Sequence, residues 1–457
     1  MKEKLSVKKN ERYTLDIIDL SYEGMGVAKI DGYPLFIENA LPGERVEVLV
    51  VKAGNKFGYG KVEKWLTESP DRQPLKDNRL LRTGIAPLAH LNYEQQLLFK
   101  QKQVENVMSK IAKMPEVNIL PTIPMENPVG YRNKAQIPVR RIDGRLATGF
   151  YKKNSHELVE IEDYYIQDPA IDEAIKRVRD ILQRFQVRGY NEAKNEGQIR
   201  HIIIRRGHYS HEMMVVLVTR KEKFFKGKEI ASIIHEELPE VVSVVQNINE
   251  EKTNVILGDK EKVLYGRSYI EDQLLGKTYR ISSKSFYQVN TEQTEKLYQT
   301  AIEFAALQKE DTVIDAYSGI GTIGLSLADK VKEVYGMELV PEAIEDAQFN
   351  ALTNKIENAH YEVGKAETVM KKWQDKGIKP SVIVVDPPRK GLDARFIASA
   401  IDMEPAKLVY ISCNPATFAR DAKLFAESGY EVKKVQPVDL FPQTHHVELV
   451  ALLAPKG

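Results

Sequence analysis

Five short segments of alternating apolar and polar residues fill most of the first 66 residues. They cover residues 14–20, 27–30, 33–37, 44–52 and 59–65. Turn-forming residues separate them, among them Gly24, Gly32 and the pair Pro42-Gly43. Alternation with a period of two predicts strands that bury one face. About five such strands in roughly sixty residues predict a small barrel of the oligonucleotide-binding (OB-like) type.

Apolar strands alternate with helical segments from about residue 278 to the C-terminus. The predicted strands begin near residues 312, 333, 361, 381, 408, 430 and 446. Repeated strand–helix units predict a mostly parallel sheet with right-handed crossovers. The last two strands are joined by a short loop and predict an antiparallel hairpin. An α/β sheet that ends in this way is typical of the class I (Rossmann-like) methyltransferase fold.

The region between these two parts, residues 67–277, is predicted to be an α+β domain. Periodicity over residues 92–112 predicts a helix, which we expect to pack on the C-terminal domain. Cations alternate with apolar residues over 130–141 and 198–207, so strands there would have one basic face. Such a face suits either a phosphate backbone or plain solvent. The chain is thus predicted to be an α/β multidomain protein with domains at 1–66, 67–277 and 278–457.

Composition narrows the class of protein. The 457 residues contain one cysteine, which excludes an internal disulfide framework or a cysteine-ligated cluster. No apolar run is long enough to span a bilayer, and the N-terminal residues lack the apolar core of a signal peptide. We therefore expect a cytoplasmic protein that does not associate with membranes and acts as a monomer. The net charge of +1 neither requires nor forbids a nucleic-acid partner.

A glycine-rich turn follows the first strand of the C-terminal sheet. The run from Asp315 to Gly324 contains three glycines and no cation, and an acid, Glu338, ends the next strand. A carboxylate there can accept hydrogen bonds from both ribose hydroxyls of an adenosine. The lack of cations favours S-adenosylmethionine over a phosphate-bearing dinucleotide. Asp315 itself either contacts the cofactor or braces the loop, and Asp386, before two prolines, ends the fourth strand.

The only cysteine, Cys413, follows a short apolar strand and precedes the turn Asn414-Pro415. The carboxyl end of a strand in an open α/β sheet is where such sheets bind ligands, although a lone cysteine also occurs as a buried structural thiol. A nucleophilic role would require the thiolate, since a free cysteine has a pKa of about 8.5. The N-terminus of the following helix, Arg389 and Arg420 are the candidates for stabilising that anion.

Three motifs in the C-terminal domain resemble those of a known family. They are Asp386-Pro-Pro-Arg-Lys-Gly391, Ser412-Cys-Asn-Pro-Ala-Thr417 and Phe441-Pro-Gln-Thr-His-His-Val-Glu448. Ser285-Phe-Tyr-Gln-Val-Asn290 resembles the segment that opens the catalytic domain of the same family, and the barrel resembles a TRAM domain. Together they resemble the RNA 5-methyluridine methyltransferases over nearly the whole chain. Within that family the chain most resembles the Gram-positive members that methylate 23S ribosomal RNA and are reported to act at two sites.

The resemblance implies roles for particular residues. It implies Cys413 as the nucleophile that adds to uracil C6 and Glu448 as the base that removes the C5 proton. Outside that context, Glu448 would read as a surface strand residue. The implied cofactor is S-adenosyl-L-methionine, contacted by Gln288, Tyr317, Glu338 and Asp386. The implied RNA contacts are Arg132, Lys134 and Arg200, and the expected partner is a structured loop of 23S ribosomal RNA with a flipped-out uridine.

The chain departs from many relatives in one respect. Those relatives carry a four-iron cluster on cysteines, whereas the corresponding run from Arg82 to His90 has none. We expect no iron–sulfur cluster and no other metal site. The alternatives are the same reaction on the T-loop uridine of tRNA, or a catalytically idle RNA-binding or ribosome-assembly factor. A 5-methylcytidine enzyme usually carries a second cysteine, which is absent. His445 and His446 are expected to be structural, unless His446 orients the loop.

Overall fold

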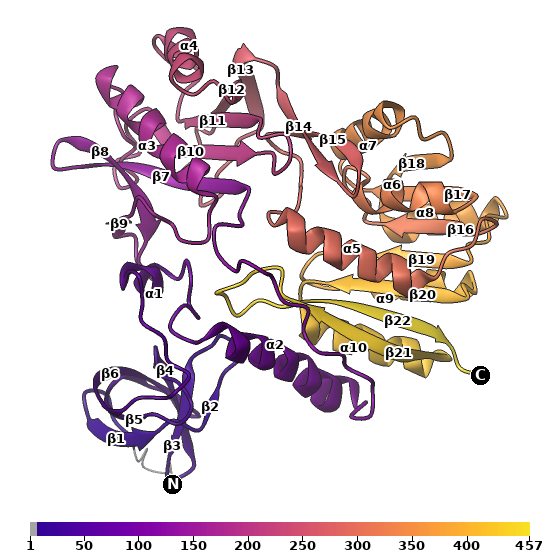
Figure 1. The fold of residues 1–457 in the computed structure, drawn as a ribbon, viewed down its shortest axis with the longest axis horizontal. Helices are drawn as coiled ribbons and strands as arrows, with labels where there is room; N and C mark the ends of the chain where they lie inside the picture. The colour runs from indigo at the N-terminus through magenta and orange to yellow at the C-terminus, as the bar shows by residue number, and fades with distance from the viewer. Residues whose placement is uncertain (1–6) are drawn as a thin grey trace.

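The N-terminal residues form a six-stranded barrel (Figure 1). The computed structural model describes residues 7–457, and the strands of this barrel follow one another in space as β1-β5-β6-β4-β3-β2. They are β1 (Arg12–Asp16), β2 (Asp19–Leu20), β3 (Gly26–Ile30), β4 (Tyr33–Glu38), β5 (Arg45–Ala53) and β6 (Gly58–Thr67). The segment predicted as one strand over 14–20 bends at Ile17, whose side chain is buried. Because β1 and β2 stand at opposite ends of the strand order yet are almost continuous in sequence, the bend closes the barrel.

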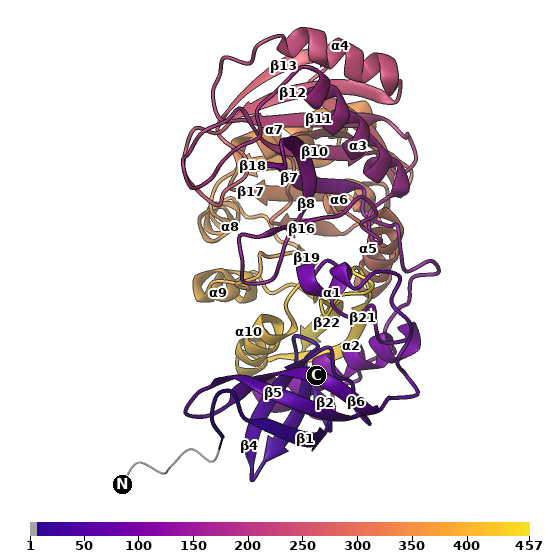
Figure 2. The ribbon, with the colours of Figure 1, turned by 90° about the vertical axis from the view of Figure 1, so that its left-hand side faces the viewer.

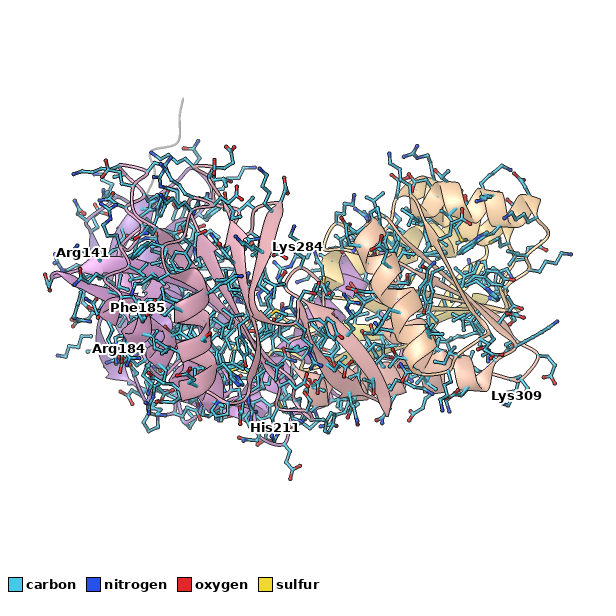
Figure 3. The ribbon with its side chains drawn as sticks, turned by 90° about the horizontal axis from the view of Figure 1, so that it is seen from above. Arg141, Arg184, Phe185, His211, Lys284 and Lys309 are labelled. Atoms are coloured by element: carbon cyan, nitrogen blue, oxygen red, sulfur yellow. The ribbon has the colours of Figure 1, made fainter. Side chains whose placement is uncertain are left out.

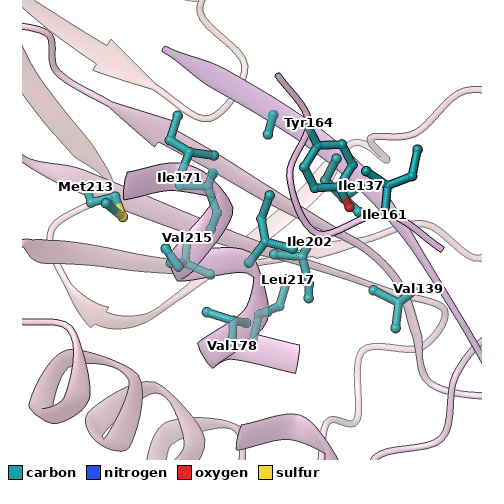
Figure 4. Close-up of a cluster of buried hydrophobic side chains, with 14 of the residues drawn as sticks. Ile137, Val139, Ile161, Tyr164, Ile171, Val178, Ile202, Met213, Val215 and Leu217 are labelled. Atoms are coloured by element: carbon teal, nitrogen blue, oxygen red, sulfur yellow. The ribbon is translucent and has the colours of Figure 1, made fainter. Parts of the chain in front are cut away.

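The central region is built on a seven-stranded sheet in the order β13-β12-β11-β10-β7-β8-β9. Its strands are β7 (Lys134–Ile142), β8 (Arg145–Tyr151), β9 (Leu158–Glu160), β10 (Ile199–Arg206), β11 (Met213–Thr219), β12 (Val241–Ile248) and β13 (Lys260–Gly266). Helices α3 (Pro169–Arg184) and α4 (Gly227–Glu237) cover one face, where they enclose a buried apolar cluster that includes Ile202 and Leu217 (Figures 1 and 4).

The other face of the central sheet is part of a second apolar cluster, which extends into the C-terminal domain. That cluster joins Ile203 and Val216 to Ile270 and Tyr279 of a two-stranded hairpin and to α5 (Thr291–Ala305). The hairpin consists of β14 (Tyr269–Leu274) and β15 (Lys277–Ser282). A domain boundary drawn between residues 277 and 278 therefore falls inside a paired sheet.

The C-terminal sheet has the strand order β18-β17-β16-β19-β20-β22-β21. Its strands are β16 (Thr312–Ala316), β17 (Glu333–Glu338), β18 (Ala359–Val363), β19 (Val382–Val385), β20 (Lys407–Ser412), β21 (Tyr430–Val438) and β22 (Glu448–Pro455). Six of the seven strands run in the same direction, while β22 runs antiparallel to its neighbours β20 and β21. The connecting helices are α6 (Thr322–Leu327), the short η2 (Ala328–Lys330), α7 (Pro341–Thr353), α8 (Ala366–Asp375), α9 (Ala394–Asp402) and α10 (Pro415–Glu427). This is the class I arrangement expected from the strand–helix pattern.

Residues between the barrel and the central sheet are packed against both larger domains. After the short helix α1 (Arg79–Thr83), helix α2 (Tyr93–Val107) continues as a π-helical turn, η1 (Met108–Ala112). Val104 and Met108 lie in one apolar cluster with residues of α10, and Figures 1 and 2 show α2 lying next to the barrel. Beyond η1, Ile119 and Ile123 bridge in parallel to Val435 and Val438 on the edge strand β21.

None of the helices within residues 7–457 combines the length and the apolar character that a bilayer-spanning segment needs. Over the same residues, no group of three or more His, Cys, Asp or Glu side chains is arranged to hold a metal ion.

Candidate active site

Cys413 and Glu448 lie beside each other at one edge of the C-terminal sheet. Ser412, the last residue of β20, pairs with Leu449 in β22, so the next residue outward on each strand is Cys413 and Glu448 respectively. Antiparallel neighbours at such positions bring their side chains within a few ångströms. Cys413 is half-buried, whereas Glu448 is only 4% exposed. No residue within 7–457 donates a hydrogen bond or an ion pair to the Glu448 carboxylate, which leaves it free for an external group.

Burial, and repulsion between neighbouring acids, raise the pKa values of the acidic groups at this edge. Loss of hydration raises the pKa of Glu448 to about 8, with the nearby charge of Asp386 adding to the effect. Burial likewise raises the pKa of Asp386 to about 7. For Cys413, burial comes first, followed by Glu448 and Asp386, and together they raise the thiol pKa to about 11. Arg389 opposes these effects at both Cys413 and Glu448, because its positive charge favours their anions.

The loop that carries Arg389 is tied to the start of α10. The Asn414 side-chain amide and the Thr417 hydroxyl both donate to the Arg389 carbonyl, at 3.0 and 3.3 Å. The other candidate cation, Arg420, instead bonds to Asp421 and to the carbonyls of Lys390 and Leu392. Of the two arginines, Arg389 is therefore the one that acts on the thiol.

The glycine-rich turn lies beside these groups. Tyr317 has a left-handed backbone with φ +66°, and its ring packs against Phe396 at 5.7 Å between centroids. Gly319 donates its N–H to a Glu338 carboxylate oxygen at 3.3 Å, and Glu338 also accepts from the amides of Leu339 and Val340. A side chain added at Gly319 would meet no atom within 4 Å, so the turn borders open space.

Asp315 braces this turn, which was one of its two predicted roles. One of its carboxylate oxygens accepts the Gly324 N–H at 2.8 Å, while the other is buried without a partner. Burial first, and then Asp386 and Glu338, raise the pKa of Asp315 to about 7. Gln288 comes just before α5, where its backbone carbonyl accepts from the Asn133 side chain at 3.0 Å. Its side chain is engaged by no residue within 7–457.

The chemistry of this pocket fits a cationic, phosphate-free cofactor. Asp386 and Glu338 are close enough to raise the pKa of Asp315, and no arginine or lysine among residues 7–457 forms an ion pair with any of these three carboxylates. A phosphate would be repelled from such a group, whereas a sulfonium would be attracted. Gln288, Tyr317, Glu338 and Asp386 are the residues that would hold S-adenosylmethionine there.

The two basic stretches, residues 130–141 and 198–207, differ in how far their cations are buried and paired inside the protein. Arg200 does not face solvent as predicted. It is 3% exposed, and its guanidinium donates to the carbonyls of Asn249, Glu251 and Thr253 while lying over the Tyr190 ring at 4.6 Å. The prediction that Arg200 contacts RNA is therefore corrected, because all of its donors face inward. Arg205 is equally buried against Ser283 and Ser285.

Arg132 and Lys134 have no such partners. Both are half-buried, and no acidic group within residues 7–457 pairs with either of them. Burial, followed by Arg205 and Arg132, lowers the pKa of Lys134 to about 7. Lys134 is the first residue of β7 and Arg132 lies two residues before it. Arg141, near the other end of that strand, lies on the side of the molecule away from the C-terminal domain (Figure 3). Only the first part of the basic stretch is near the site.

Family models match both parts of the molecule. The model described as tRNA (Uracil-5-)-methyltransferase matches residues 92–456, and the TRAM domain model matches residues 6–62. The chain belongs to the tRNA (uracil-5-)-methyltransferase family. It is a TRAM-domain RNA methyltransferase that uses S-adenosyl-L-methionine. The cofactor pocket described above agrees with that assignment.

Relatives of this family resemble the chain along its whole length. A protein named as an uncharacterized RNA methyltransferase from Lactiplantibacillus plantarum is 57% identical, with 99% of each chain covered. One from Enterococcus faecalis with the same description is 54% identical, with 98% of each covered. Among solved structures, the tRNA (uracil-54, C5)-methyltransferase of Pyrococcus abyssi in complex with S-adenosyl-L-homocysteine has a TM-score of 0.79 and 27% identity, covering 96% of this chain and 99% of that one.

Two features of the site are not indicated by any pattern in the sequence. The first is a buried ion pair between Lys100 and Asp439 behind the loop that leads to Glu448. The second is the state of the histidines in that loop: burial lowers the pKa of His446 to about 4, so the ring is neutral at pH 7 and packs against Phe441 and His445. The sequence does not indicate the ion pair, because a lysine such as Lys100 within a predicted helix is usually exposed to solvent.

Proposed function

We propose that this enzyme transfers a methyl group from S-adenosyl-L-methionine to C5 of specific uridines in 23S ribosomal RNA, with Cys413 as the nucleophile and Glu448 as the base. The observation that carries the proposal is the register of β20 and β22, which sets a thiol beside a buried carboxylate that has no intrachain partner. Both groups, and the residues toward the cofactor, come from one chain, so the active unit would be a monomer.

The reaction needs these two groups because uracil C5 is too weak a nucleophile to attack a methyl sulfonium. The Cys413 thiolate adds to C6, an S–C6 bond forms, and the electrons of the C5=C6 double bond make C5 the nucleophilic carbon of an enolate. S-adenosyl-L-methionine supplies the methyl group that C5 accepts. Glu448 then takes the proton from C5, the C5=C6 double bond re-forms, and the S–C6 bond breaks to return the thiolate.

The two carboxylates near Cys413 make ionisation of the thiol depend on a positive charge close by. Asp386 and Glu448 raise the thiol pKa, so any positive charge near these two carboxylates lowers it. Arg389 supplies part of that charge from within the protein. A sulfonium held beside Asp386 would add to it, which links formation of the nucleophile to a filled cofactor pocket.

Arg132 and Lys134 support a role in holding RNA. They are cations at the start of β7 with no acidic partner among residues 7–457, and Arg132 is close enough to His446 to influence its titration. A target uridine must leave a base stack to reach this half-buried thiol, at a cost of a few kcal/mol that is smallest in loops. Phosphates on either side of a flipped nucleotide would pair with these cations, so a structured RNA loop is the expected substrate.

The mechanism is tested by two variants of the purified enzyme on RNA fragments. For Cys413→Ser we expect no detectable methyl transfer with unchanged cofactor affinity. For Glu448→Gln we expect a covalent RNA–protein adduct that persists on denaturing gels, because the S–C6 bond can form and the C5 proton cannot leave. Substantial turnover by either variant would contradict the assigned role. A wild-type enzyme that binds rRNA and tRNA without methylating either would favour the non-catalytic alternative.

Transfer RNA is the second candidate substrate, and the similarity to the Pyrococcus abyssi tRNA enzyme favours it. Mapping 5-methyluridine in both RNA classes from a deletion strain separates the two. We expect loss of the modification from 23S ribosomal RNA with the tRNA T-loop unchanged. Loss from tRNA alone would assign the tRNA substrate instead.

A further inference from the structure

The loop that leads into Glu448 is held by side chains from distant parts of the chain. Residues 439–447 connect β21 to β22, and Glu448 is the first residue of β22. Helix α2 supplies several of the bonds. Lys100 donates to the Phe441 carbonyl and Gln103 donates to the His445 carbonyl, both at 3.0 Å. Gln96 and Gln443 exchange two bonds at 3.0 Å, through side chain and backbone.

Two other segments bind the same loop. Tyr131, next to Arg132, donates its hydroxyl to the Pro442 carbonyl at 3.0 Å. At the start of α5, Asn290 donates to the Leu440 carbonyl and Gln293 to the Asp439 carbonyl, each at 2.9 Å. The backbone of the loop is thereby fixed from three sides before it reaches the base.

Lys100 and Asp439 form a fully buried ion pair at the centre of these contacts. Both side chains are 0% exposed, and the Tyr93 hydroxyl donates to the second Asp439 oxygen at 2.8 Å. Burying two charges costs several kcal/mol per ion, and well-packed apolar residues in their place are often neutral or stabilising. Stability alone therefore does not explain this pair. What the pair supplies, and apolar residues would not, is a fixed position for the first residues of the loop, Asp439 to Phe441.

We propose that α2 is a positioning element for the base and that Lys100 is the positioning residue through which it acts. The inference rests on the proposed role of Glu448. Because the Glu448 carboxylate accepts no hydrogen bond within residues 7–457, its position depends on packing and on where the backbone places it. Its backbone is set on one side by the pairing of β22 with β20 and on the other by the loop that Lys100 ties to α2.

The test compares three full-length variants: Lys100→Met/Asp439→Leu, Lys102→Met and Glu448→Gln. In Lys100→Met/Asp439→Leu both charges are replaced by apolar groups of similar size, so no lone charge stays buried. We expect this variant to melt within a few degrees of wild type and to bind RNA and S-adenosylmethionine normally. Its kcat should fall about 100-fold, as expected for a base displaced by about 1 Å. Lys102→Met, on the exposed side of the same helix where Lys102 pairs with Asp19, should retain wild-type kcat and KM.

The decisive measurement is the amount of covalent RNA–protein adduct at steady state. A misplaced base slows proton removal but not addition of the thiol, so the double variant should accumulate adduct as Glu448→Gln does. Wild-type kcat in the double variant, or a loss of kcat without adduct, would overturn the inference. If Glu448→Gln itself turns over normally without adduct, the proposed function fails. If Glu448→Gln traps adduct and the double variant does not, only the role of Lys100 fails.

Discussion

Strands β7 and β10 lie side by side in the central sheet and have the same basic pattern, but the cations at the start of β7 differ from those of β10 in whether they have partners. Lys134 is paired in register with Arg205, so the two are direct neighbours. On β10, the guanidinium groups of Arg200 and Arg205 are buried against backbone carbonyls, and Arg206 pairs with Asp168 and Glu240. On the β7 side, no acidic group in the described part of the chain pairs with Arg132 or Lys134.

This difference separates two uses of positive charge. An arginine whose guanidinium is buried and donates to carbonyls inside the protein stabilises the fold and is not accessible to a phosphate. A half-buried cation without a partner is costly to keep, and that cost is offset only when a ligand brings the opposite charge. The same contrast holds for the acids: Asp439 is paired, whereas Glu448 and Asp386 form no ion pair with any residue from 7 to 457.

The largest effect is expected from removing a partnered arginine. Arg200→Met would leave the carbonyls of Asn249, Glu251 and Thr253 buried without a donor. We expect the free energy of unfolding in urea to fall by about 3 kcal/mol. RNA affinity per folded molecule should stay the same. Weaker RNA binding at unchanged stability would erase the distinction between the two strands.

A smaller effect, of the opposite kind, is expected for an unpartnered cation. Arg132→Gln should weaken RNA binding about tenfold, or roughly 1.4 kcal/mol, without lowering stability. The slope of log Kd against log salt concentration should fall by about 1, since one phosphate contact is lost. Arg177→Gln is the matched control, because Arg177 is exposed on α3 and already paired with Glu173. An equal loss of affinity in the control would show that the effect is only one of net charge.

The smallest effect concerns pH. Burial lowers the pKa of Lys134 to about 7, so this side chain is charged below pH 7 and neutral above it. RNA affinity should therefore decrease on the order of threefold between pH 6 and pH 8 through this group. Lys134→Met should remove that part of the pH dependence, as measured by filter binding across the range. A pH dependence unchanged in Lys134→Met would show that another group is responsible.

The sequence predicted the catalytic sheet well because its strands are short apolar runs, each followed by an amphipathic helix. It also placed Cys413 and Glu448 at one sheet edge, since a return strand must begin where its antiparallel neighbour ends. The fate of Arg200 was not predictable in this way. Its carbonyl partners lie about fifty residues away, in a loop after β12, and no local pattern indicates them. Lys100 and Asp439 are 339 residues apart, so their pairing is visible only in the folded molecule.

The short parallel bridges from Ile119 and Ile123 to β21 bear on how the chain can be divided and made. They cover the edge strand β21 of the methyltransferase sheet. The residues that cover it are synthesised long before β21 is. More than three hundred further residues must therefore be synthesised before Ile119 and Ile123 can pair with β21. A fragment starting at residue 278 would leave β21 bare, ready to pair with another copy, and we expect it to aggregate.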